Sequence, residues 1–332
     1  MKRRHFTRSA AALACALGLL HNPVAAQTKW DLPSAYAPAN FHTENLQAFA
    51  KDVDAATNGK LKITVHPGAS LFKAPEIKRA VQGGQAQLGE ILLVNYENEN
   101  PIFGLDGVPF LATSYANAQR LYAAQKPALD KYLADQGLRI LYTVPWQPQG
   151  IYSKKPVQAV ADMRGLKWRA YSVATSKMAE LMGLQPVTVQ AAELSQAMTT
   201  GVVEAYISSS ATGVDSKTYE SLKYFYDTQA WLPKNAVIVS TKAFNSLDTA
   251  SQDGLLKAAA QAEARGWKLS QEKDEGFKKT LADKGMSVQA PSAKFSYDLK
   301  QVGAIMLSDW QKKAGSDGQA LVANYSKASA GK

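Results

Sequence analysis

The chain has 332 residues, of which 46% are hydrophobic and 20% charged, which is typical of a globular protein and excludes a disordered, collagen-like or coiled-coil chain. At this length a single core usually splits, so we expect two lobes of roughly 100–200 residues each. The formal net charge is +10, but residues 1–26 carry four basic and no acidic side chains, and the remainder carries 34 basic and 28 acidic side chains, or +6. Beyond residue 26 the longest basic runs are pairs such as Lys154-Lys155, which disfavours a nucleic-acid partner.

Residues 1–26 have the three-part organisation of a bacterial signal peptide. A basic segment at 2–8 precedes an apolar run at 10–20, which is too short to span a bilayer, and small residues follow at 24–26. We expect cleavage after residue 26 and a periplasmic mature chain that begins at Gln27. The general and the twin-arginine export routes both remain open.

The mature chain lacks the residues of several common kinds of site. The only cysteine, Cys15, lies inside the predicted signal peptide, and only His42 and His66 remain after cleavage. The sequence contains no H-E-x-x-H, G-x-S-x-G, G-x-x-x-x-G-K-[ST] or strand-associated G-x-G-x-x-G motif. We therefore expect no metal, no cofactor and no catalytic residue, although catalytic groups are recognised by geometry and an enzyme stays an alternative.

Strand-like and helix-like segments alternate along the mature chain. Apolar residues at helical spacing predict the helices, and alternation of apolar and polar residues predicts strands such as 61–66. The predicted elements in chain order are strand 30–35, helix 43–57, strand 61–66, helix 75–82, strand 87–94, helix 115–136, strand 139–144, strand 166–171 and helix 173–182. This order predicts an α/β fold with mostly parallel sheets.

Two longer-range patterns predict how the elements are arranged. Residues 76–84 and 193–201 both read as a helix that ends at glycine before an apolar strand, at an offset of 117 residues. Two similar halves place a cleft between them, where small-molecule sites usually form. Residues 251–284 predict one long helix despite two interior glycines, and about 30 helical residues extend about 45 Å, enough to reach across both lobes.

Five stretches together resemble a known family. They are 57–65 (TNGKLKITV), 107–111 (GVPFL), 161–169 (ADMRGLKWR), 198–205 (MTTGVVEA) and 244–247 (FNSL). In this order, over nearly the whole mature chain, they resemble the solute-binding proteins of tripartite ATP-independent periplasmic (TRAP) transporters, the DctP family. The resemblance implies a two-lobed periplasmic-binding-protein-like fold with a ligand cleft between the lobes and a long helix that bridges them. The lobes are expected at 27–146 plus about 235–274 (lobe I) and 147–234 plus about 275–332 (lobe II).

Arg169 is the first candidate ligand-binding residue. On the predicted strand 166–171, Lys167, Arg169 and Tyr171 share one face. An arginine can hold a carboxylate with two parallel hydrogen bonds, which lysine cannot reproduce. From the residues alone, Arg169 is either a solvated strand residue or such a clamp, and the resemblance implies the clamp.

The resemblance also implies other cleft positions. Ser172 and Ser208 stand where sialic-acid-binding relatives have asparagines, Gln149 stands where they have a second arginine, and Ala191 replaces an aromatic residue, so sialic acid is not the expected ligand. The remaining expected ligand-binding residues are Trp146, Tyr206, Asn235, Glu90 and Leu92. Core packing is the alternative for Trp146 and Tyr206. Glu90 either contacts the ligand or pairs with Arg169.

A single arginine among apolar and aromatic residues favours a ligand with one carboxylate. We expect an aromatic or apolar hydroxy or keto acid, and otherwise a C4-dicarboxylate. Residues 204–210 (EAYISSS) depart from the pattern of many dicarboxylate-binding relatives, which leaves the ligand and any metal-assisted binding open.

Three functions are compatible with these patterns. The first is a periplasmic receptor that delivers a small carboxylate to the membrane permease subunits of a TRAP transporter. The second is an exported lyase or hydrolase for small acids, for which Glu90 is the one candidate general base. The third is the binding protein of an ABC importer.

Overall fold

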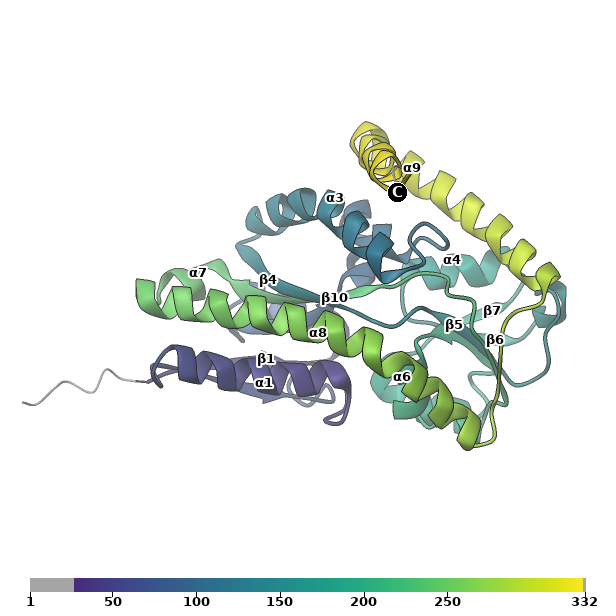
Figure 1. Cartoon of the computed structure of the whole chain (residues 1–332), viewed down its shortest axis with the longest axis horizontal. Coiled ribbons are helices and arrows are strands. Elements are labelled where there is room, and N and C mark those ends of the chain that lie inside the picture. Colours follow the sequence, from purple (N-terminus) through teal and green to yellow (C-terminus); the bar gives the residue numbers. More distant parts are fainter. Residues whose placement is uncertain (1–26, 331–332) are drawn as a thin grey trace, which may run out of the picture.

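The computed structural model describes residues 27–330 and has two α/β lobes side by side (Figure 1). The predicted signal peptide lies outside the described residues. Lobe I contains a parallel strand pair and a three-stranded antiparallel sheet of order β3-β10-β4. Its strands are β1 (Thr28–Pro33), β2 (Leu61–His66), β3 (Leu88–Leu92), β4 (Leu138–Pro145) and β10 (Lys234–Ser240). Its helices are α1 (Phe41–Ala56), α2 (Ile77–Gln82), α3 (Tyr115–Ala134) and α7 (Thr241–Asn245).

Lobe II is built on one six-stranded sheet of order β11-β9-β5-β8-β6-β7. Its strands are β5 (Gly150–Ser153), β6 (Lys167–Ala170), β7 (Gln185–Thr188), β8 (Ala205–Ser208), β9 (Tyr224–Tyr226) and β11 (Ser287–Gln289). Its helices are α4 (Val173–Leu181), α5 (Leu194–Thr199) and α6 (Ser210–Asp215). The predicted α/β class and the two-lobed architecture are therefore confirmed, whereas the exact lobe boundaries stay a prediction.

The expectation of mostly parallel sheets is wrong. Of the eight strand pairings, four are antiparallel, and each of these four involves β5 or β10. Both strands begin where the chain has just crossed from the other lobe. Each of the two strands therefore runs antiparallel to its neighbours in the sheet, which are strands that helical crossovers connect.

The two crossing segments, 146–149 and 227–233, lie against each other between the lobes. The backbone N–H of Trp146 donates to the carbonyl of Pro233 at 2.8 Å, and that of Gln149 donates to the carbonyl of Trp231 at 2.9 Å. The N–H of Ala230 returns a bond to Gln149 at 3.0 Å. This ladder joins β4 to β5 and β9 to β10 in one narrow connection.

Two long helices also join the lobes. Helix α8 (Thr249–Asp283) confirms the predicted long helix and runs along the length of the molecule (Figure 1). Its first half packs Leu255 and Ala262 into the core of lobe I, and Leu281 packs into lobe II. Helix α9 (Ala293–Ala330) starts against lobe II, turns at Gly315 and ends beside α3.

The repeat seen in the sequence is a structural repeat. Helix α2 is followed by Gly84 and β3, and helix α5 is followed, 117 residues later, by Gly201 and β8. Both glycines adopt positive φ angles, 75° and 71°. Glycine takes this left-handed conformation without steric cost, and it ends each helix so that the chain can enter the next strand.

Candidate ligand-binding site

A cavity of about 320 Å³ lies between the two lobes. Its walls come from segments that follow the carboxyl ends of strands β1, β3, β6, β7 and β8, together with the two crossing segments. This is the edge at which open α/β sheets usually bind ligands, because successive loops meet there. The side chains that line the cavity include aromatic, polar and charged ones: Tyr36, Asn40, Leu92, Asn95, Trp146, Gln149, Arg169, Tyr171, Ser195, Ser208, Thr212, Asp215 and Ser216.

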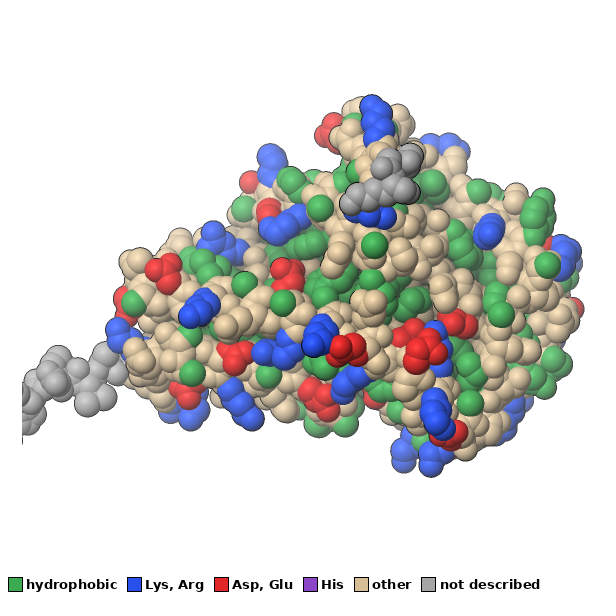
Figure 2. Space-filling model, in the orientation of Figure 1, with side chains coloured by type: hydrophobic (Ala, Val, Ile, Leu, Met, Phe, Trp, Pro, Cys, Tyr) green, Lys and Arg blue, Asp and Glu red, His purple; other side chains and the backbone are tan. Residues whose placement is uncertain are grey.

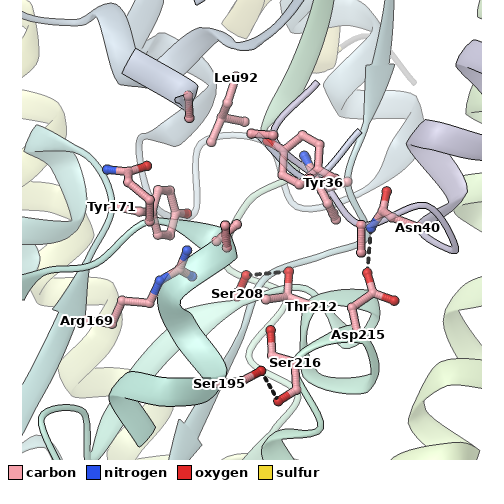
Figure 3. Close-up of a pocket in the computed structure, with 18 of the residues that line it drawn as sticks. Tyr36, Asn40, Leu92, Arg169, Tyr171, Ser195, Ser208, Thr212, Asp215 and Ser216 are labelled. Atoms are coloured by element: carbon pink, nitrogen blue, oxygen red, sulfur yellow. Dashed lines mark hydrogen bonds between the residues drawn. The ribbon is translucent and has the colours of Figure 1, made fainter. Parts of the chain in front are cut away.

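Arg169 is a buried cation on one side of the cavity (Figure 3). It lies on β6, is 3% exposed, and donates from Nε to the carbonyl of Val189 at 3.0 Å. Its guanidinium lies 4.9 Å from the ring centre of Tyr171 and 5.8 Å from that of Tyr206. These contacts fix the side chain and leave both terminal nitrogens without a hydrogen-bond partner among the described residues.

Arg169 also forms no salt bridge with any residue in 27–330, and burial lowers the pKa of its guanidinium. A buried charge without a counter-ion costs several kcal/mol. An anion in the cavity would offset that cost, and a carboxylate matches the two free nitrogens with parallel hydrogen bonds. The arrangement is therefore suited to binding an anion.

Asp215 and Asn40 lie on the other side of the cavity (Figure 3). Asp215 ends α6 in lobe II, and its Oδ2 accepts a 2.6 Å hydrogen bond from Nδ2 of Asn40 in lobe I. Asn40 is the N-cap of α1, where its Oδ1 accepts from the N–H of His42 at 2.8 Å. The pair connects the lobes directly, and burial raises the pKa of the Asp215 carboxyl.

Hydroxyl groups line the wall that β8, α5 and α6 contribute (Figure 3). Ser208 donates to Oγ1 of Thr212 at 2.9 Å, and Ser195 donates to the carbonyl of Ser216 at 2.9 Å. Hydroxyl oxygens can accept further hydrogen bonds while they donate. This wall therefore offers polar groups to a ligand without adding charge.

A buried hydrogen-bond network supports the aromatic wall of the cavity. Trp146 donates from Nε1 to Oδ1 of Asn235 at 3.0 Å, and Tyr36 donates to the same oxygen at 3.3 Å. Asn235 in turn donates to Oε1 of Glu90 at 3.0 Å, and Ser34 donates to Oε2 of Glu90 at 2.6 Å. The network holds the two aromatic side chains in one orientation.

Comparison with known proteins identifies the family. The family model for DctP, bacterial extracellular solute-binding protein family 7, matches residues 34–314. The chain is a DctP-family solute-binding protein. Three solved structures are similar to it.

The receptor DctP6 of Bordetella pertussis is 61% identical, with a TM-score of 0.89 over 90% of this chain and 100% of that one, and is described as binding pyroglutamic acid. A TRAP solute-binding protein from a marine metagenome is 47% identical (TM-score 0.89; 91% and 99% covered) and is described as specific for pyroglutamate. DctP7 of Bordetella pertussis is 45% identical (TM-score 0.89; 90% and 99% covered) and is described as binding pyroglutamic acid.

The family assignment confirms the resemblance found in the sequence. This DctP-family protein is a solute-binding receptor of the TRAP type rather than an enzyme. The family comprises extracytoplasmic receptors. Among the described residues, no helix combines the length and the hydrophobicity required to cross a bilayer, and no group of three potential metal ligands occurs.

The structure brings five of the nine predicted ligand-binding residues of this DctP-family protein to the cavity. These are Arg169, Ser208, Gln149, Trp146 and Leu92. The other four lie elsewhere. Ser172 caps α4 by accepting from the N–H of Thr175, and Tyr206 is buried between Tyr152 and Arg169.

Asn235 and Glu90 lie behind the aromatic wall of the cavity. Of the two alternatives for Glu90, the pairing with Arg169 does not occur, because the two oxygens of Glu90 already bond to Ser34 and Asn235. Glu90 is 3% exposed, so it is not available as a general base for a molecule in the cavity.

Several cavity residues of this DctP-family protein are not among those predicted from the sequence. They are Tyr36, Asn40, Asn95, Tyr171 and Asp215. Tyr36, Asn40 and Asn95 follow the carboxyl end of a predicted strand within five residues, and Tyr171 is the last residue of another, which is the signal that could have found these four. Asp215 lies farther along, at the end of α6, where no local pattern marks it.

Proposed function

We propose that this receptor captures pyroglutamate (5-oxoproline) and holds its carboxylate on Arg169. The observation that carries the proposal is a buried arginine that has no salt bridge among the described residues and faces a cavity between the lobes. Three similar proteins, 45–61% identical, are described as binding pyroglutamate. Pyroglutamate replaces the hydroxy or keto acid expected from the sequence, and it is likewise a monocarboxylate with a compact apolar body.

The cavity supplies chemistry for the rest of the ligand. The methylene edge of the five-membered ring suits the apolar surfaces of Leu92, Trp146 and Tyr171. The lactam has one N–H donor and one carbonyl acceptor, which amide side chains can match. Among the described residues, Oδ1 of Asn95 is buried without a hydrogen-bond partner, and the side-chain Nε2 of Gln149 donates only to the carbonyl of Gln147, at 2.9 Å.

Binding favours the closed arrangement of the lobes. Residues of both lobes line the cavity, so a ligand that contacts both walls has a higher affinity for the closed state and shifts the population toward it. In the proposed role, the closed receptor docks on the membrane permease subunits of a TRAP transporter. The surface in Figure 2 shows basic side chains interspersed with acidic ones, which supports a small-molecule partner over a nucleic acid.

The proposal includes export of the protein. Residues 1–26 act as a cleaved signal peptide, which leaves a mature periplasmic chain that begins at Gln27. Mass spectrometry of the protein recovered from the periplasm is expected to give the mass of residues 27–332. A protein retained in the cytoplasm with its first 26 residues attached would contradict this part.

The binding proposal is tested by calorimetric titration of the mature chain with pyroglutamate. Wild type is expected to bind, Arg169→Ala to lose binding, and Arg169→Lys to bind roughly 10- to 100-fold more weakly, because lysine keeps the charge but cannot form two parallel hydrogen bonds. The matched control is Arg164→Lys, an exposed arginine five residues earlier, which should bind like wild type. Equal affinities of wild type and Arg169→Lys would show that the arginine does not hold the carboxylate.

A further inference from the structure

The lining of the cavity contains one acidic side chain, Asp215, and one basic side chain, Arg169. They lie on opposite sides of the space (Figure 3), and no salt bridge joins them within the part of the chain that the structure describes. A ligand that places a carboxylate on Arg169 therefore directs its other end toward a carboxylate of the protein.

Asp215 is held in this position by Asn40, a lining residue from the other lobe. Its Oδ2 accepts from Asn40, while no described residue donates to its Oδ1. The charged or titratable groups around it are His42 and Glu44 on α1 and Lys273 on α8. Lys273 forms its salt bridge with Glu44, at 3.0 Å, and Nδ1 of His42 lies 3.3 Å from Oε1 of Glu90, and neither residue forms a salt bridge with Asp215 in the described part of the chain.

We propose that Asp215 is a specificity-determining residue that excludes acids with a second carboxylate. The inference rests on the proposed function, because it takes the carboxylate on Arg169 as given. The lactam of pyroglutamate is neutral: its N–H adjoins the carbon that bears the carboxylate, and the far edge of the ring has only methylene groups and a carbonyl, so it brings no second charge to the far wall. A dicarboxylate of the same carbon count, glutarate, would instead bring a second negative charge toward Asp215.

The size of the effect follows from electrostatics. Two like charges about 6 Å apart at an effective dielectric constant of about 20 disfavour binding by roughly 100-fold. No lysine or second arginine lines the described cavity to compensate. The pocket is therefore matched to a monocarboxylate with a neutral far end.

Calorimetric titration with pyroglutamate and with glutarate, at one pH near 7 and one salt concentration, tests the proposal. Wild type is expected to bind glutarate far more weakly than pyroglutamate. In Asp215→Asn, which keeps the shape and removes the charge, the ratio of the two dissociation constants is expected to fall at least 10-fold. Asp215→Ser is the second variant, and the same fall is expected there.

The matched control is Glu193→Gln, which removes one exposed negative charge next to the lining segment 190–192 and keeps a side-chain oxygen that can accept from the N–H of Gln190. Its ratio should equal that of wild type. An unchanged ratio in both Asp215 variants, or an equal fall in Glu193→Gln, would overturn the proposal while pyroglutamate binding stands. Wild type that binds glutarate but not pyroglutamate would overturn the proposed function as well.

Discussion

Arg169 and Lys234 are both buried cations, but they differ in what surrounds them. Lys234, at the start of β10, is fully buried, and its Nζ lies 3.1 Å from Oδ2 of Asp106, which also accepts from the N–H of Lys234 at 2.9 Å. No acid within residues 27–330 pairs with Arg169, which faces a cavity instead. The ammonium of Lys234 is paired with an acid of the protein and holds the end of the crossing segment 227–233. The guanidinium of Arg169 is available to a ligand.

The Lys234–Asp106 pair leads to a prediction about the free energy of unfolding. Asp106→Asn should lower the free energy of unfolding by roughly 3–5 kcal/mol, because it leaves a fully buried ammonium without a counter-ion. Urea unfolding followed by circular dichroism measures the change. Asp130→Asn, in an exposed pair with Lys126 on α3, should change it by less than about 1 kcal/mol. Equal effects of the two substitutions would show that burial of the pair does not matter.

Helix α8 shows how one element can contain glycines of two different kinds. Gly266 lies where the helix crosses lobe I, and a Cβ there would overlap the side chain of Val144 and lie 2.8 Å from Nδ2 of Asn45. Gly276 has no atom within 4 Å of the position of a Cβ. The first glycine permits close packing of α8 on β4 and α1, and the second has no such role.

The two glycines should therefore respond oppositely to alanine. Gly276→Ala is expected to raise the free energy of unfolding by roughly 0.5–1 kcal/mol, because alanine is the better helix former and meets no neighbour. Gly266→Ala is expected to lower it by roughly 1–3 kcal/mol, because overpacking outweighs that gain. Chemical denaturation of both variants beside wild type provides the comparison, and stabilisation by Gly266→Ala would contradict the packing argument.

The whole molecule is organised around one cavity that neither lobe forms alone. Arg169 and Asp215 come from lobe II, Asn40 and Leu92 from lobe I, and Trp146 from a crossing segment. The 2.6 Å contact between Asn40 and Asp215 spans the lobes in this closed arrangement. Separation of the lobes about the crossing segments would break that contact and expose the cavity.

Ligand should therefore make the molecule more compact and more stable. The radius of gyration measured by X-ray scattering is expected to decrease when pyroglutamate is added, and Trp146 fluorescence is expected to change, because that ring lines the cavity. At 100 times the dissociation constant, ligand should stabilise the native state by about 2.7 kcal/mol, seen as a rise in Tm. The same additions to Arg169→Ala serve as the control, and compaction of that variant would show that closure does not depend on the anion.

Local patterns in the sequence were sufficient for the family, for most elements up to residue 182, for the long α8 and for the repeat of α2 and α5, but not for α9 or the strands β9, β10 and β11. The predicted helices follow from periodicity and glycine stops, because these depend on residues that are close in the chain. The stretch 161–169 likewise indicated Arg169, since its resemblance to the family depends only on residues that follow one another in the sequence. The residues by themselves left two alternatives for this arginine, and the resemblance chose between them.

Only the tertiary structure decided what lies opposite Arg169 and what lies behind the cavity wall. Asp215 and Asn40 are 175 residues apart, and nothing in either neighbourhood indicates the other. Glu90 was expected in the cleft, but long-range bonds to Ser34 and Asn235 place it in a buried network. Periodicity indicates which face of an element is buried. The elements that pack against that face depend on how the chain crosses between the lobes. In this protein, the two crossing segments and the two long helices determine that arrangement.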